Sequence, residues 1–248
     1  MLLVALLYVL LSPAGSAIAQ EAPGAGIASL QTMLQDKSPE IRIKAAEGLA
    51  RVGGRRSVII LRRGLSDKTT EVRVAVVEAL GFVGGRLALT VLSEALKDRD
   101  VQVRLRAVEA LKDAGTVSAI PILQKAFGDK EASVRMRAAL MLRKIGHRSG
   151  VPVLGRAVLA DRDPTARAVC ARYLGRLGVK DPRSVGILVK VLTDDRSPAV
   201  RLRAVEALGF VQLPQAIAAL QTALAVKDTG VRIRATEIMG RVLAKHFE

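Results

Sequence analysis

Histidine and cysteine, the side chains that most often serve as nucleophiles, bases or metal ligands, are scarce in this sequence. Its 248 residues include two histidines and one cysteine. His147 is predicted to lie in a loop and His246 in the C-terminal tail, whereas Cys170 falls among small apolar residues, which is typical of a core position. The H-E-x-x-H, G-x-S-x-G and C-x-x-C motifs do not occur. The sequence therefore predicts neither a catalytic site nor a metal site nor a cofactor, and no enzymatic activity.

Basic residues are the more informative chemical groups. Lysines and arginines number 39 against 23 aspartates and glutamates, which gives a formal net charge of +16. In one region cations lie close to apolar side chains, and the glutamates found at the equivalent positions elsewhere in the chain are missing. The residues of this region are Arg137, Leu140, Lys144, Arg172, Tyr173 and Arg176. Neighbouring cations repel one another, so an anionic partner is the obvious compensation. The pattern predicts a partner-binding site at these six residues, and the alternative is neutral variation on a solvated surface.

A repeating frame must position these side chains, because an arginine recurs every 31 to 34 residues. The arginine column is Arg42, Arg73, Arg104, Arg135, Arg167, Arg201 and Arg232. In each unit an apolar residue precedes the arginine, a small apolar residue follows three positions later, and Leu or Met follows seven positions later. A fixed period of this length predicts a solenoid, in which each unit buries its apolar face only against its neighbours.

Each unit is predicted to contain two helices. In the first unit these are Ile27–Gln35 and Pro39–Val52. The first helices of the later units are predicted at Val58–Leu65, Leu87–Leu96, Ser118–Phe127, Val151–Leu159, Val185–Leu192 and Gln215–Leu224. Five second helices are followed by a glycine, which favours a left-handed C-terminal cap, at Gly53, Gly84, Gly115, Gly146 and Gly178. The seventh unit lacks this glycine and is predicted to continue into the tail.

A helical wheel divides the second helix into two sides, with positions counted from the arginine. An apolar stripe is formed by the positions minus one, plus three, plus seven and plus ten, and the arginine lies on the shoulder of this stripe, at the edge between the apolar and the exposed side of the helix. Plus two, plus five and plus nine fall on the opposite side and are predicted to face solvent. Leu140 and Arg172 occupy plus five, where the other five units have glutamate. The fourth and fifth units are therefore where the exposed side departs from the repeat.

An aspartate lies six residues before six of the seven arginines. These residues are Asp36, Asp67, Asp98, Asp129, Asp161 and Asp195. The seventh unit has Val226 at this position and Asp228 two residues later. A ligand-binding stripe would mark one or two units, so the regular recurrence favours a structural ladder of ion pairs between helices and repeats.

The helix pairs, the D-x5-R spacing and the pattern V-R-x-x-A-x-x-[AL]-L-G-x-[IVL]-G resemble HEAT repeats, and the likeness is greatest to the short HEAT-like class of phycobilisome lyase subunits. The resemblance covers about residues 27 to 244. It implies an all-α fold, a right-handed α-solenoid of about seven helix pairs, whose second helices line a concave surface that normally binds other macromolecules. Lyase activity is not implied, because the repeat occurs in many unrelated proteins.

The N-terminal segment has the layout of a secretory signal peptide. Residues 1–19 contain no charged side chain, and an apolar run is followed by Pro13 and by the small-x-small site that ends at Ala19. The basic residue that usually precedes such a run is missing. We expect residues 1–19 to be a signal peptide, 20–26 a flexible lead-in and 27–248 the solenoid. The expected product is exported, periplasmic or secreted, with no membrane span after cleavage.

Three classes of function fit these observations. The expected one is a non-catalytic, exported scaffold that binds an acidic or mixed-charge protein on its concave face. One alternative is a binder of a polyanion such as nucleic acid, anionic lipid or acidic glycan, although aromatics are only 2% of the chain and stacking on bases would need more. The other alternative is an accessory subunit of a bilin-lyase-like enzyme, which rests on the repeat resemblance.

Overall fold

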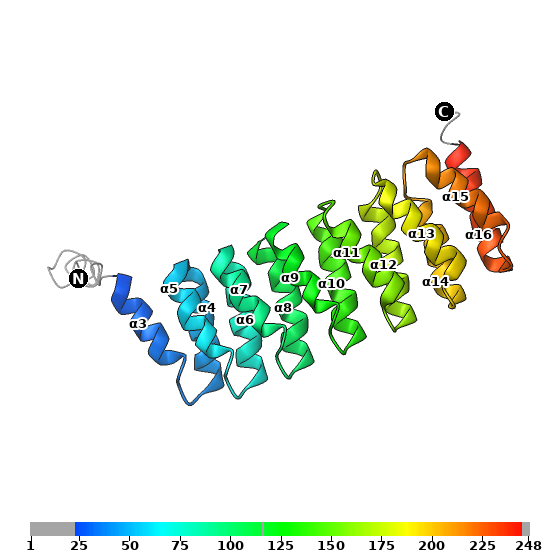
Figure 1. The fold of residues 1–248 in the computed structure, drawn as a ribbon. Coiled ribbons are helices and arrows are strands. Elements are labelled where there is room, and N and C mark those ends of the chain that lie inside the picture. Colours follow the sequence, from blue (N-terminus) through cyan, green and yellow to red (C-terminus); the bar gives the residue numbers. More distant parts are fainter. Residues whose placement is uncertain (1–22, 116, 245–248) are drawn as a thin grey trace, which may run out of the picture.

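The computed structural model is an extended array of paired helices (Figure 1). It describes residues 23–115 and 117–244, and within these ranges every regular element is helical. The predicted signal peptide, residues 1–19, lies outside the described residues, as do 20–22 of the predicted lead-in. The all-α solenoid predicted from the period is confirmed.

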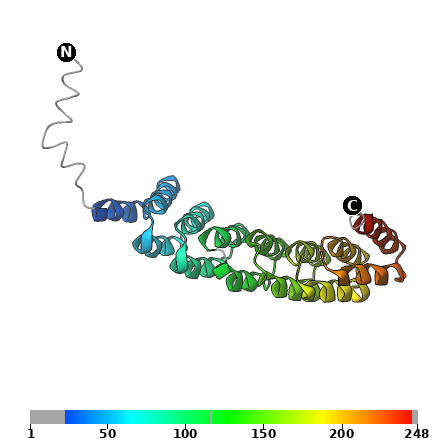
Figure 2. The same cartoon turned by 90° about the horizontal axis from the view of Figure 1, so that it is seen from above.

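The pairs alternate a first and a second helix along the chain. The first helices are α3 (Pro23–Met33), α5 (Gly54–Gly64), α7 (Gly85–Ala95), α9 (Ile120–Ala126, after a 3-10 turn at Val117–Ala119), α11 (Gly150–Ala160), α13 (Pro182–Asp194) and α15 (Pro214–Leu224). The second helices are α4 (Pro39–Val52), α6 (Thr70–Val83), α8 (Val101–Ala114), α10 (Ala132–Ile145), α12 (Pro164–Leu177), α14 (Pro198–Leu208) and α16 (Thr229–Ala244). Figure 2 shows them as two layers, and the array bends toward the layer of second helices. That layer therefore lines the concave side.

The ends of several helices differ from the prediction. Helix α3 begins at Pro23, so residues 23–26, predicted to be a flexible lead-in, are helical. Proline is well accommodated in a first turn because its missing N–H has no partner there. At the other end α16 extends to Ala244, and its predicted continuation into the tail, residues 245–248, lies outside the described residues.

The glycines after the second helices rarely form the predicted left-handed cap. Only Gly146 adopts it, with φ 72° and ψ 5°. Gly53 and Gly84 have positive φ with an extended ψ near −167°, since α5 and α7 begin at the very next residue and the chain must reverse at once. Gly115 is fully extended and Gly178 has a negative φ. A tight connection to the next helix thus replaces the expected cap.

The apolar stripe predicted by the wheel forms the core. The plus-three residues of all seven units are completely buried, and so are the plus-seven leucines of the first six. Small residues let neighbouring second helices approach closely: a methyl group on Gly81 of α6 would lie 2.8 Å from the Cβ of Ala110 in α8. Each unit therefore seals the apolar face of the one before it.

Five of the seven column arginines are buried in this core rather than placed on its shoulder, namely Arg42, Arg73, Arg104, Arg135 and Arg167, while Arg201 and Arg232 are partly exposed. Each of the first six arginines pairs with an aspartate of the following repeat, and the main-chain carbonyl of the aspartate six residues before it accepts a hydrogen bond from it. Arg232 has no aspartate partner among the described residues. Arg104 donates from Nε and Nη2 to the Asp129 carboxylate at 2.7 and 3.1 Å, and from Nη1 to the main-chain oxygen of Asp98 at 2.9 Å. The corresponding pairs are Arg42–Asp67, Arg73–Asp98, Arg135–Asp161, Arg167–Asp195 and Arg201–Asp228. The ladder thus joins repeats, one to the next.

The charges of the ladder are stabilised by this geometry. Burial raises the pKa of the carboxyls of Asp67, Asp129 and Asp195, but hydrogen bonds from the preceding repeat's arginine and from the main-chain N–H two residues on outweigh it, and the net pKa is lowered. Hydrogen bonding to aspartate likewise raises the pKa of five ladder arginines, Arg42, Arg73, Arg104, Arg135 and Arg167. Among the described residues no helix is long and apolar enough to cross a bilayer.

Candidate functional site: a basic groove at the ends of the second helices

The six residues of the predicted binding site lie on two neighbouring second helices. Helix α10 carries Arg137, Leu140 and Lys144, and the other three residues are on α12. The two helices pack against each other in the middle of the array (Figure 1). The structure therefore brings the predicted residues onto one surface, although it gives them different environments.

Arg137 is not the unpaired cation that the sequence predicts. Its Nη1 forms an ion pair with Glu109 of α8, in the preceding repeat. The same kind of pair joins Arg106 to Glu78 at 3.0 Å. The prediction compared cations only with acids on the same helix, and the acid that neutralises Arg137 comes from the adjacent one.

Leu140, Arg172 and Tyr173 are partly engaged with the fold. Leu140 and Tyr173 are half-buried and pack on the hydrophobic core. The guanidinium carbon of Arg172 lies 5.0 Å from the centre of the Tyr173 ring, and its Nη2 donates to the Tyr173 hydroxyl at 3.2 Å. Arg172 is therefore held against its neighbour and is less available to a ligand than the sequence predicts.

Lys144 and Arg176 are the exposed cations of the group. Within the described residues neither forms an ion pair. Both occupy plus nine, and Phe210 occupies plus nine of the next repeat, just after α14. The guanidinium carbon of Arg176 lies 4.9 Å from the centre of the Phe210 ring, and Phe210 is 43% exposed. Consecutive plus-nine residues thus place two cations beside an exposed aromatic face.

These residues line an open groove of about 860 Å³ between the ends of α10, α12 and α14. Its other lining residues include Arg143 and Gln212, and no acidic side chain of the described chain contributes to it. The main-chain N–H of Gln212 donates to the carbonyl of Val179 at 2.8 Å, which ties together the two loops that form one wall. We call this surface the basic groove.

The position of the cations explains how the fold tolerates them without acids. Arg143, Lys144 and Arg176 lie in the last turns of their helices, where the negative end of the helix dipole favours positive charge by about 0.3–1 kcal/mol each. The groove can bind an anion, with Phe210 offering an apolar face to the rest of the ligand. Sequence reasoning missed Arg143 and Gln212, because their proximity depends on how the loops of successive repeats are placed.

The residues suited to catalysis lie outside this groove or are occupied. Cys170 is completely buried in α12, and burial raises the pKa of its thiol to about 12, with the charge of Asp161 acting in the same direction. His147 contacts the Ser149 hydroxyl through Nδ1 at 2.7 Å. The described residues contain no group of histidine, cysteine and acidic side chains that could hold a metal ion. The described lining of the groove thus offers cationic side chains and an aromatic ring, and no histidine, cysteine or acidic side chain.

Comparison with protein families finds the repeat along nearly the whole array. The HEAT-repeat family model matches residues 27–112, 89–165 and 151–240. These overlapping segments cover most of the described helices, from α3 to α16.

Individual relatives match more narrowly. A phycocyanobilin lyase subunit alpha from Synechococcus elongatus is 36% identical over 88 residues, which is 33% of this chain and 32% of that protein. The match therefore spans about a third of the length of this curated relative.

Two solved structures have a similar arrangement of helices. The complex of CpcE and CpcF of phycocyanin lyase from Nostoc sp. has a TM-score of 0.46 and 23% identity, with 90% of this chain and 95% of that chain covered. Human deoxyhypusine hydroxylase in complex with glycerol has a TM-score of 0.42 and 19% identity, with 93% and 100% covered.

The lyase match corrects two expectations drawn from the sequence. The expectation of a non-catalytic scaffold and that of no enzymatic activity are both contradicted by similarity to a lyase subunit. Export of the chain is not tested by this match and stays a prediction. The match favours the alternative of an accessory subunit of a bilin-lyase-like enzyme.

Proposed function

This chain belongs to the HEAT-repeat family, and we propose that it is an accessory subunit of a lyase-type enzyme that handles a bilin, an open-chain tetrapyrrole. The observation that carries the proposal is the 36% identity over 88 residues to a phycocyanobilin lyase subunit. A protein partner follows from the same proposal, because that relative is itself named as a subunit.

The basic groove supports this proposal by its chemistry. A bilin carries propionate carboxylates on a flat, conjugated and largely apolar body. Lys144 and Arg176 are exposed cations that would pair with carboxylates, and Arg143 adds a third positive charge to the same surface. The exposed ring of Phe210 would lie against the conjugated body of the ligand. The groove's part is to hold and orient the bilin, while the partner subunit supplies the remainder of the enzyme.

The proposal is tested by titrating the full chain with free phycocyanobilin and following the absorbance of the bilin. The double variant Lys144→Glu with Arg176→Glu places two acids where the carboxylates would bind, and we expect affinity to fall by about tenfold or more. Binding should also become less sensitive to salt. The protein should stay folded because both side chains are exposed, with only a modest fall in melting temperature from the reversed charges at two helix C-termini.

The matched control is Lys68→Glu with Lys130→Glu, which changes the net charge equally on exposed loops remote from the groove. Affinity for the bilin should stay nearly unchanged in the control. Equal losses in the two double variants would mean that the overall charge of +16 attracts the ligand. No binding by the unmodified chain would equally refute the proposal. The acidic protein partner predicted from the sequence at Arg137, Leu140, Lys144, Arg172, Tyr173 and Arg176 stays a prediction that the same variants test.

A further inference from the structure

The two ends of the helical array carry complementary halves of the contacts that join its repeats. Inside the array each ladder arginine donates hydrogen bonds from Nε or Nη2, and usually from both, to the aspartate of the following repeat. In the interior repeats, as at Asp129, that aspartate also accepts a hydrogen bond from the main-chain N–H two residues later. Within residues 23–244 no repeat precedes the α3–α4 pair and none follows the α15–α16 pair. The ladder residues of these two pairs therefore differ from those of the interior repeats.

Asp36 opens the ladder at the N-terminal end. Its Oδ1 accepts the main-chain N–H of Ser38 at 2.8 Å, as in the interior repeats, but no arginine of the described chain reaches its carboxylate. At the C-terminal end Arg232 donates from Nη1 to the carbonyls of Val226 and Lys227 at 2.9 and 2.8 Å, again as in the interior. Its Nη2 donates to the hydroxyl of Thr229 at 3.0 Å, and no aspartate of a following repeat lies within the described residues. One end thus presents an acid without its base, and the other a base without its acid.

A second row of ion pairs on the concave side is interrupted in the same way. Glu109 accepts from Arg106 of its own repeat and from Arg137 of the next. Glu206 likewise accepts from Arg203 and from Arg234 of the next repeat.

The terminal members of this second row are again complementary. Among the described residues, Glu237 of the last repeat forms an ion pair only with Arg234, which belongs to its own helix. Within the same part of the chain, Lys44 of the first repeat forms an ion pair only with Glu47, also on its own helix. At the N-terminal end, Lys44 therefore lacks a glutamate from a preceding repeat of the described chain. At the C-terminal end, Glu237 lacks a cation from a following repeat of the described chain.

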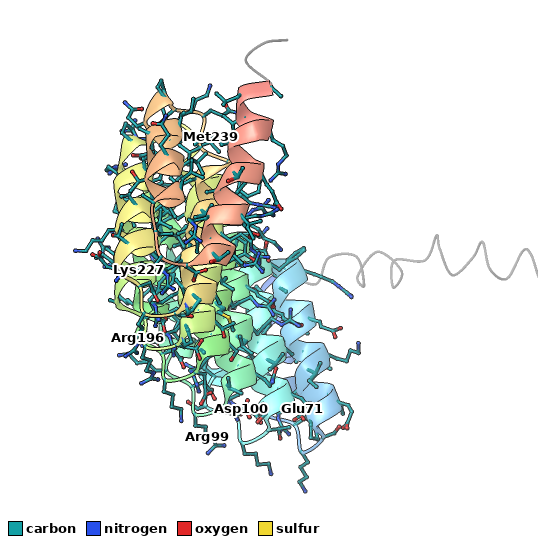
Figure 3. The ribbon with its side chains drawn as sticks, turned by 90° about the vertical axis from the view of Figure 1, so that its right-hand side faces the viewer. Glu71, Arg99, Asp100, Arg196, Lys227 and Met239 are labelled. Atoms are coloured by element: carbon teal, nitrogen blue, oxygen red, sulfur yellow. The ribbon has the colours of Figure 1, made fainter. Side chains whose placement is uncertain are left out.

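Apolar side chains are uncovered at both ends as well. Ile41 is 37% exposed, whereas its equivalents in the later repeats are at most 1% exposed. Ile233 is 57% exposed, although its equivalents in the other repeats are half-buried. Met239 is only half-buried, whereas the leucines of its column are fully buried. Figure 3 views the array from this end, with Met239 and Lys227 labelled on the last repeat.

We propose that a second copy of this chain stacks head to tail on the first, with its α3–α4 pair packed on α15–α16. In this arrangement Arg232 would take the incoming Asp36 as Arg201 takes Asp228, and Glu237 would take the incoming Lys44 as Glu206 takes Arg234. The interface repeats the contact already used between every pair of neighbouring repeats. Because the same two ends remain free after each addition, association would continue into short linear oligomers. This inference is independent of bilin binding, since it uses none of the residues of the basic groove.

The test is sedimentation velocity of the full chain over a range of concentrations at low salt. The weight-average mass of the unmodified protein should rise with concentration. Asp36→Arg and Arg232→Asp each place like charges across the interface, so each variant alone should remain monomeric at concentrations at least about tenfold higher. An equimolar mixture of the two variants restores opposite charges at every junction and should associate again.

Glu71→Arg is the matched control, because it makes the same charge change on an exposed residue of an interior repeat. It should associate as the unmodified chain does. Circular dichroism checks that the end variants fold. The proposal is overturned if the unmodified chain stays monomeric, or if the folded single variants associate as well as the control.

Discussion

Replacing one buried arginine of the ladder offers a quantitative test of how the repeats are joined. In the variant Arg104→Ala, a side chain that is 5% exposed is removed together with two hydrogen bonds to the carboxylate of Asp129. The main-chain oxygen of Asp98 also loses its donor at 2.9 Å. The carboxylate of Asp129, which is 7% exposed in the intact protein, would keep only the hydrogen bond from the N–H of Glu131. Breaking one side of a buried pair costs about 3–5 kcal/mol, and we expect a loss in that range.

Arg106→Ala is the matched comparison on the same helix. Its side chain is 44% exposed and its ion pairs to Glu78 and Glu109 lie in solvent, so the loss should be less than about 1 kcal/mol. Urea melts followed by far-ultraviolet circular dichroism give both free energies of unfolding. The double variant Arg104→Met with Asp129→Leu removes both charges and should recover much of the loss. Equal costs for Arg104→Ala and Arg106→Ala would refute the reasoning from burial.

Two further predictions follow from the pKa shifts. The pKa of Asp129 is lowered from 3.8 in the folded chain, so the stability it contributes is present above pH 3.8 and is lost as the pH falls through its folded value. Acid titration should therefore unfold the array below pH 3.8, and Arg104→Ala should weaken this contribution to the acid transition. Cys170 is fully buried with a pKa raised to about 12, so a thiol reagent at neutral pH should label it no faster than the repeat opens. Rapid labelling of the folded chain would contradict the placement of Cys170, and labelling in urea serves as the control.

Two cations of the basic groove could be predicted from the sequence, because departures from a repeat stand out against its columns, whereas the predicted Arg137, Leu140, Arg172 and Tyr173 are not among its lining residues. Lys144 and Arg176 were expected to be exposed cations, and the structure places them on one groove. Arg137 was expected to lack an acid, yet Glu109 of the preceding repeat provides one. A helical wheel ranks positions within one helix and carries no information about the neighbouring helix. Phe210 and Gln212 join the groove only through the packing of successive repeats.

The sequence by itself determined the helix pairs, their number and the residues that form the core. A period of 31 to 34 residues with apolar side chains on one helical stripe can bury that stripe only by stacking. The tertiary structure decided which aspartate each arginine meets. Asp98 and Asp129 occupy the same position in successive repeats, so the sequence alone does not say which of them pairs with Arg104. The stacking of repeats brings the Asp129 carboxylate to Nε of Arg104, while Asp98 accepts a hydrogen bond from this arginine only through its main-chain carbonyl. Contacts between repeats depend on the rise and rotation of the stack, and these quantities are set by the packing of whole helices.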